Sequence, residues 1–166
     1  TGGEFSEIRF ADLGLDPSRE YFVFELWSKK LLGSFSLRFA PGQLDPKFKS
    51  QAFCIRERKP HPQLIATSRH ISCGGVDLEN LQWDGERLTG KSALVGQDSY
   101  TLYLTEPAGY RFEKFECAQL PPARIEKEGL MIKIILNSEK SCLVEWAASF
   151  SNSGQIPGTH YLTQKN

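Results

Sequence analysis

The sequence predicts an all-β protein, with a partial antiparallel β-sandwich followed by a sandwich of the immunoglobulin or fibronectin kind. Two observations support this class. Apolar and polar residues alternate in short runs from Phe5 to Phe150, which is the period of a half-buried strand. Each run closes with Gly, Pro, Asn or Asp, the residues that favour turns. About ten strands with turns at this spacing are typical of antiparallel sandwiches.

In the first part of the chain we expect strands at residues 6–10, 20–27, 34–39 and 52–57. The second of these runs is apolar on both faces, which indicates a central strand covered on both sides. In the third run large apolar residues alternate with polar ones, so we expect one face to hold Phe35, Leu37 and Phe39.

A charged segment with two prolines, residues 56–62, is the candidate domain boundary, because prolines and adjacent charges cannot join a central ladder. The predicted units are residues 1–59, residues 60–150 and a flexible tail at 151–166 that is poor in apolar residues. Four strands make only half a sandwich, and an isolated half exposes a sheet face and an unpaired edge. Either the missing strands lie upstream in a longer protein, or the first four strands pack against the second unit.

In the second part we expect strands near residues 63–67, 76–83, 88–95, 100–105, 110–117, 124–126, 130–136 and 142–150. The pair Asp84-Gly85 predicts a tight hairpin in which both central residues take positive φ. The alternation of the last strand predicts one apolar face made of Cys142, Val144, Trp146, Ala148 and Phe150. Only residues 77–83 also fit a short helix, with Asp77 as its N-cap.

Composition excludes several classes of partner. Lys and Arg together number 20, as do Asp and Glu, so the chain has no basic field that would recruit nucleic acid or anionic lipid. No apolar run approaches the roughly 20 residues that span a bilayer. The first residues lack the charged and apolar regions of a signal peptide. We therefore expect neither a nucleic-acid partner nor a membrane.

The four cysteines, Cys54, Cys73, Cys117 and Cys142, are widely spaced and form no zinc or redox motif, so we expect no metal and no cofactor. A disulfide stays open for any pair, although a chain of this length does not need one. Four free thiols would fit a reducing compartment, and Asn-x-Ser/Thr sequons are absent. These features favour a prokaryotic cytoplasmic or periplasmic protein.

Residues 11–33, 61–72 and 75–78 resemble the region that follows the catalytic barrel in α-galactosidase-like (melibiase-type) glycoside hydrolases. The first stretch reads Ala-Asp-Leu-Gly-Leu-Asp-Pro-Ser-Arg-Glu-Tyr-Phe-Val-Phe-Glu-Leu-Trp-Ser-Lys-Lys-Leu-Leu-Gly, and the second begins at His61 with His-Pro-Gln-Leu-Ile-Ala-Thr-Ser-Arg-His-Ile-Ser. The likeness covers about residues 11–96, and the segment 95–100 departs from the Gly-Gly-Asp-Pro expected there. It implies that residues 1–59 form the second half of a sandwich behind a (β/α) barrel. The family's catalytic carboxylates belong to that barrel, which is absent from this chain.

The residues themselves suggest no catalytic set. A glycosidase needs two carboxylates about 5 to 10 Å apart. Asp77 and Glu79 share a face if residues 76–83 form a strand, but their closeness follows from the strand pleat alone. The three histidines, His61, His70 and His160, stand in no Ser/His/Asp arrangement. We therefore assign no catalytic residue.

Five residues are candidates for contacts with partners. Trp83 and Tyr110 lie at strand ends beside turns, where exposed rings could form a platform for a sugar. Arg69 and His70 could bind a carboxylate or carbonyl of a neighbouring domain, and Trp27 is a candidate for interdomain packing. Turn capping and core packing are the structural alternatives.

Three functions remain open. We favour a non-catalytic accessory region of a glycoside hydrolase, whose partner is the upstream catalytic barrel of the same polypeptide. The second is a carbohydrate-binding module, with an oligosaccharide or polysaccharide as partner. The third is a self-contained enzyme of unrecognised type.

Overall fold

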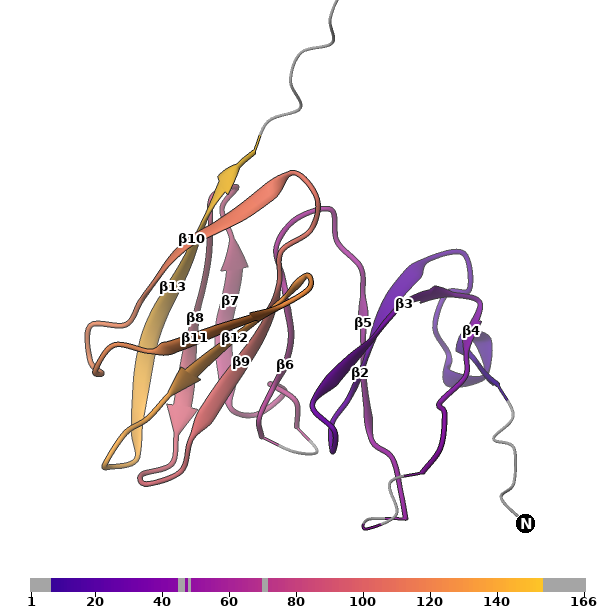
Figure 1. Cartoon of the computed structure of the whole chain (residues 1–166), viewed down its shortest axis with the longest axis horizontal. Helices are drawn as coiled ribbons and strands as arrows, with labels where there is room; N and C mark the ends of the chain where they lie inside the picture. Colours follow the sequence, from indigo (N-terminus) through magenta and orange to yellow (C-terminus); the bar gives the residue numbers. More distant parts are fainter. Residues whose placement is uncertain (1–6, 45–46, 48, 70–71, 154–166) are drawn as a thin grey trace, which may run out of the picture.

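The computed structural model describes residues 7–44, 47, 49–69 and 72–153. Within these ranges the chain forms four antiparallel sheets and one short 3-10 helix (Figure 1). The predicted all-β sandwich class is confirmed. Burial alternates along most of residues 87–94, whose sheet packs one face on a core.

The first unit is a three-stranded sheet with a small layer on its outer side. The sheet has the order β3-β2-β5, and its strands are β2 (Glu20–Glu25), β3 (Lys30–Ser36) and β5 (Phe53–Glu57). The outer layer, called the end layer below, consists of β1 (Ile8–Arg9), the 3-10 helix η1 (Phe10–Leu13) and β4 (Arg38–Phe39).

Strand β2 is covered on both faces, as its sequence predicts. Tyr21 and Val23 belong to a small core with Phe10 and Phe39 of the end layer. Phe22 and Phe24 point the other way, into a core shared with the second unit. A strand with no polar face is stable only at such a central position.

The prediction that Leu37 shares a face with its aromatic neighbours is wrong. Phe35 and Phe39 do contact the end-layer core, but Leu37 separates β3 from β4 with a φ of 66° and is 62 % exposed. Its carbonyl oxygen accepts a hydrogen bond from the Phe10 N–H at 2.9 Å. Left-handed backbone at one residue interrupts the pleat, so the side chain leaves the face that alternation assigns to it.

The second unit is a complete sandwich of two four-stranded sheets. The outer sheet, of order β10-β13-β8-β7, contains β7 (Leu78–Trp83), β8 (Arg87–Leu94), β10 (Tyr110–Glu116) and β13 (Cys142–Asn152). The middle sheet, of order β11-β12-β9-β6, contains β6 (Leu64–Thr67), β9 (Tyr100–Thr105), β11 (Arg124–Glu128) and β12 (Met131–Leu136). All eight strands expected here are present, β13 extends two residues beyond its predicted end, and the helix alternative for residues 77–83 is wrong.

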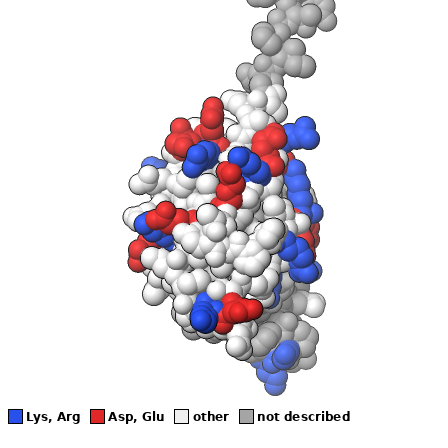
Figure 2. Space-filling model, turned by 90° about the vertical axis from the view of Figure 1, so that its left-hand side faces the viewer, with Lys and Arg blue, Asp and Glu red and all other residues white. Residues whose placement is uncertain are grey.

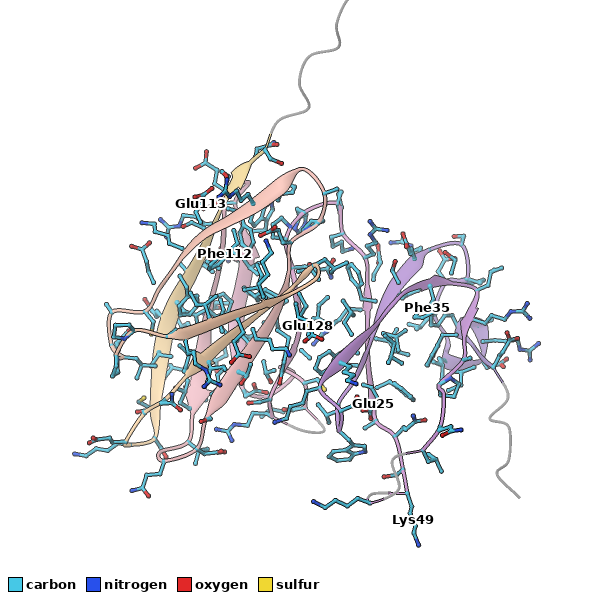
Figure 3. All side chains as sticks on the ribbon, viewed as in Figure 1. Glu25, Phe35, Lys49, Phe112, Glu113 and Glu128 are labelled. Atoms are coloured by element: carbon cyan, nitrogen blue, oxygen red, sulfur yellow. The ribbon has the colours of Figure 1, made fainter. Side chains whose placement is uncertain are left out.

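The space between the two sheets is filled by one apolar core, the sandwich core. It consists of Leu64, Leu88, Leu94, Tyr100, Leu102, Leu104, Ile132, Ile134, Leu136, Val144, Trp146, Ala148 and Phe150. The predicted apolar face of β13 contributes to it, with Cys142 packing against its rim. Figure 3 shows side chains filling this space; Phe112 packs on the core, whereas the next residue, Glu113, is exposed.

Gly90 makes room for the largest ring in this core. It lies opposite Trp146 in the β8–β13 register, and a Cβ atom at Gly90 would come within 2.7 Å of Trp146 Cζ2. The Trp146 indole Nε1 donates a hydrogen bond to Ser92 Oγ at 2.9 Å, so its buried polar atom is satisfied. Both residues are therefore required in their present size.

The three-stranded sheet of the first unit packs against the reverse face of the middle sheet. The joining core between them consists of Phe22, Phe24, Leu26, Cys54, Ile65, Ala66, Cys73, Tyr103 and Met131. The rings of Phe24 and Tyr103 are 4.7 Å apart at an angle of 45°. Three sheets are thus stacked, which corresponds to the alternative in which the first strands pack on the second unit.

The β7–β8 hairpin forms at the predicted turn, but its backbone differs from the prediction. In the β7–β8 hairpin only Gly85 of the pair Asp84-Gly85 has a positive φ, at 106°. Asp84 instead accepts hydrogen bonds from the N–H groups of Glu86 and Arg87, at 3.0 and 2.7 Å. At the sheet edge, all five residues of β11 are exposed, and four of them are charged.

Charges of both signs are interspersed on the face shown in Figure 2. Ion pairs of the chain include Lys114 with Glu116 at 3.1 Å along a strand and Lys133 with Glu128 at 2.7 Å across two strands. Exposed pairs of this kind contribute little to stability. No helix within the described ranges is long and apolar enough to cross a membrane.

Candidate functional site

The two predicted sugar-platform residues lie in contact at one end of the sandwich. Trp83 ends β7 and Tyr110 begins β10, which are the two edge strands of the outer sheet. Their ring centroids are 5.5 Å apart at 82°, an edge-to-face arrangement. Trp83 also meets Phe150 of the sandwich core, at 5.9 Å and 66°. Both rings therefore close this end of the core, and each remains partly exposed.

A third ring, His61, completes this aromatic cluster of His61, Trp83, Tyr110 and Phe150. Its imidazole stacks on the Trp83 indole at 5.3 Å with an interplanar angle of 1°. His61 Nδ1 lies 2.8 Å from the Pro62 carbonyl oxygen, which can only accept, so Nδ1 is the protonated nitrogen. Because His61 covers one face of Trp83, a sugar can reach only the surfaces of the cluster that this imidazole leaves free.

Sequence reasoning missed His61. Its position between Pro60 and Pro62 indicates only a stiff linker. An aromatic ring fixed between prolines, together with a tryptophan at a strand end, is the sequence signal that could indicate this stacking. Its partner, Trp83, lies 22 positions later in the chain, beyond any local pattern.

A second polar group lies where the 68–77 connection meets the sandwich. The buried Asp77 carboxylate accepts hydrogen bonds from the hydroxyls of Thr67, Ser72 and Tyr100, each at 2.7 Å, and from the Gly74 N–H at 3.1 Å. Burial acts to raise the pKa of Asp77, but these hydrogen bonds outweigh it and lower the pKa below its usual value. Asp77 therefore fixes the connection to β6 and β9 as a charged group.

Asp77 and Glu79 lie in different surroundings. Asp77 precedes β7 and is buried, whereas Glu79 lies within the strand and is exposed. Burial raises the pKa of Tyr100, and the adjacent Asp77 carboxylate adds to this effect. The hydroxyl of Tyr100 is thus a hydrogen-bond donor to Asp77 and holds its proton.

Arg69 lies beside this network in a pocket of about 850 Å³. Its guanidinium pairs with Asp98 and lies 5.6 Å from the centre of the Tyr100 ring. Among the residues that the structure describes, the buried Nη2 atom of Arg69 finds no acceptor. Lys29 of the first unit also lines the pocket, which therefore lies between the two units. His70, the second predicted contact residue of this segment, falls outside the described residues.

Trp27 lies where the first unit meets the sandwich. Its side chain is partly buried and packs against the joining core. The backbone here is held by Glu25, whose carboxylate accepts hydrogen bonds from the N–H groups of Trp27 and Ser28 at 3.2 and 2.6 Å. Figure 3 labels Glu25 at this end of β2. Trp27 is thus a packing residue between the units of this chain.

The outer face of the outer sheet carries a shallow depression of about 470 Å³. Its walls include the amides of Asn80 and Gln82 and an ion pair between Lys91 and Glu145. These groups have the hydrogen-bonding capacity to contact sugar hydroxyls. None of the described residues forms a cluster of three or more His, Cys, Asp or Glu side chains that could hold a metal ion.

Comparisons of the chain with protein-family models, with curated proteins and with solved structures give no match. The likeness of residues 11–96 to α-galactosidase-like enzymes therefore remains a prediction from the residues alone. The fold and the geometry above are the independent basis for a function.

Proposed function

We propose that this chain is a non-catalytic accessory β-sandwich region of an α-galactosidase-like glycoside hydrolase. In this role it packs on, and stabilises, a catalytic barrel carried upstream in the same polypeptide. The proposal rests on the sequence likeness and on one structural observation, the exposure of leucines on the end layer.

Leu37 is an exposed apolar residue whose backbone is also strained. Its left-handed φ costs on the order of 1 kcal/mol for a residue other than glycine, and its apolar side chain faces solvent. Leu13 of η1, 50 % exposed, lies in the end layer, to which Leu37 is joined by the hydrogen bond from the Phe10 N–H. Covering both side chains with a neighbouring domain would recover their burial energy.

The position of these leucines favours an upstream partner. The end layer lies on the side of the three-stranded sheet away from the sandwich, and it contains β1, the first strand of the described chain (Figure 1). A domain joined before β1 would be tethered close to this layer. The effective concentration of the two surfaces would then be high even if their contact is small.

The test compares this chain with the full polypeptide that its gene encodes. We expect the codons before Thr1 to specify a barrel with two catalytic carboxylates, and the 166-residue chain alone to leave chromogenic glycosides intact. In the full polypeptide, Leu37→Asp should lower the melting temperature of the barrel, and it should not lower that of the isolated chain. Leu143→Asp is the matched control, since Leu143 is 55 % exposed but lies on the distant β13. Turnover by the isolated chain would overturn the proposal.

Carbohydrate binding is the second candidate, and the contact between Trp83 and Tyr110 favours it. Two partly exposed rings from opposite edge strands offer an apolar surface on which a pyranose can pack. Electrophoresis in gels that contain polysaccharides tests this idea. Tyr110→Ala should abolish any retardation of the chain, whereas Phe115→Leu, a change in an aromatic residue that packs on Trp146 away from the cluster, should preserve it. Equal mobility in every gel would remove this candidate.

A further inference from the structure

Two cysteines from different units meet in the joining core. Cys54 lies on β5 of the first unit, and Cys73 lies in the 68–77 connection of the sandwich. Both are free thiols, and each is 8 % exposed. The neighbouring thiol is the largest influence on each, lowering the pKa of Cys54 and raising that of Cys73. Both side chains belong to one buried cluster, so the two thiols lie within the same core.

Polar contacts hold the pair in position. The Cys54 thiol donates to the Ile65 carbonyl oxygen at 3.2 Å, and Arg56 Nε donates to the same oxygen at 3.3 Å. Arg56 Nη2 donates to the Cys73 carbonyl oxygen at 2.9 Å. The guanidinium thus lies next to both cysteines, and its charge favours the thiolate form of Cys54.

The backbone around Cys73 is also fixed. Its N–H donates to the Arg69 carbonyl oxygen at 3.0 Å, and the following N–H, of Gly74, donates to the Asp77 carboxylate. Cys73 itself has a φ of 46°, a left-handed conformation that is uncommon outside glycine. The hydrogen bonds of the Cys73 and Gly74 N–H groups hold this thiol within the joining core.

We propose that Cys54 and Cys73 are an oxidative modification site, which a peroxide converts into a disulfide that joins the three-stranded sheet to the sandwich. The Cys54 thiolate attacks one peroxide oxygen, the O–O bond breaks, and the departing oxygen leaves as water after taking up a proton. Cys73 then attacks the resulting sulfenic sulfur, the S–S bond forms, and the second oxygen leaves as water with the Cys73 proton. The two sulfurs together lose two electrons, which reduce the peroxide.

The modification would change how firmly the two units are joined. In the reduced chain their contact depends on side-chain packing in the joining core. A disulfide closes the chain between Cys54 and Cys73 and removes freedom from the unfolded state, so we expect the melting temperature to rise by about 5 °C or more.

The experiment maps disulfides in the folded, reduced chain after treatment with a small excess of hydrogen peroxide. The sample is denatured, alkylated and digested with trypsin without a reductant. We expect peptides 50–56 and 70–87 to appear as one species whose mass is two hydrogens below their sum. Chain denatured before oxidation is the control, and it should give mixed pairings.

Variants separate this pair from the other thiols. The double substitution Cys117→Ser with Cys142→Ser should retain the linked peptides and the rise in melting temperature, whereas Cys54→Ser should lose both. Recovery of Cys54 and Cys73 as alkylated thiols after oxidation of the folded wild-type chain would overturn the proposal. Linkage of either one to Cys117 or Cys142 would overturn it as well. These results do not depend on the function proposed above.

Discussion

The sandwich core and the joining core lie on opposite faces of the same middle sheet, yet they are built differently. The sandwich core is large and apolar, and its tryptophan is matched to a glycine on the neighbouring strand. The joining core is smaller, and it contains two thiols and a methionine. The guanidinium of Arg56 lies beside it. The difference indicates that the sandwich contributes more hydrophobic burial than the junction, which holds the two thiols of the proposed disulfide.

The largest expected effect is at Trp146. Trp146→Ala should lower the free energy of unfolding by about 4 kcal/mol, because it leaves a cavity and removes the partner of Ser92. Urea denaturation followed by circular dichroism measures this loss. Leu143→Ala, on the exposed face of the same strand, is the control and should change stability by less than about 0.5 kcal/mol. Similar losses in both variants would contradict the assignment of Trp146 to a dominant core.

The joining core should open without unfolding the sandwich. Phe24→Ala should lower the stability of the first sheet by about 3 kcal/mol, since the ring is fully buried against Tyr103. Hydrogen exchange should then accelerate in β2, β3 and β5 and remain slow in β8 and β13. Leu32→Ala, at a more exposed position on β3, serves as the matched control. Uniform acceleration across all sheets would show that the two cores unfold as one.

The Asp77 network gives a smaller effect that depends on pH. Asp77→Asn should cost about 2 kcal/mol at pH 7, because the amide cannot accept all four hydrogen bonds. The folded chain holds the pKa of Asp77 below its unfolded value of about 4, so the contribution of the carboxylate is complete above that pH. It declines as the pH falls through the folded pKa, and the gap between wild type and variant should narrow in acid. Denaturation midpoints between pH 7 and pH 3 measure this gap, and a constant gap would contradict the charged form.

The smallest expected effect is at Leu37. Leu37→Asn should raise stability by less than about 1 kcal/mol, since asparagine tolerates the left-handed backbone and little apolar burial is lost. Thermal denaturation of the isolated chain measures it, with Leu13→Asn, at a position of helical backbone, as the control that gains nothing.

The sequence predicted the strands well because alternation is a local signal. The faces of β2 and β13 follow directly from which residues are apolar. The prediction for Leu37 is wrong because a single left-handed residue changes the face on which its side chain lies. The alternation of apolar and polar residues does not reveal such a residue. The sequence also fits Asp77 as a helix N-cap, because an N-cap and a buried hydrogen-bond acceptor both require a side chain such as a carboxylate.

The sites were harder to predict because their parts are distant in sequence. The positions of Trp83 and Tyr110 at strand ends predict partly exposed rings, but their contact and the stacking of His61 depend on how the sheets pack. The four cysteines left every pairing open, and only the packing of β5 on the middle sheet brings Cys54 to Cys73. Local pattern predicts elements, whereas contacts between elements require the tertiary structure.

The exposed edge of the middle sheet has a consequence for the behaviour of the protein at high concentration. A second molecule that added a strand beside β11 would have to bring its own chain against Arg124, Glu126, Lys127 and Glu128. Such a partner strand would need complementary charges in matching register, which an arbitrary β-strand lacks. This edge therefore discourages the addition of a strand from another molecule, whereas a flat apolar edge would favour it.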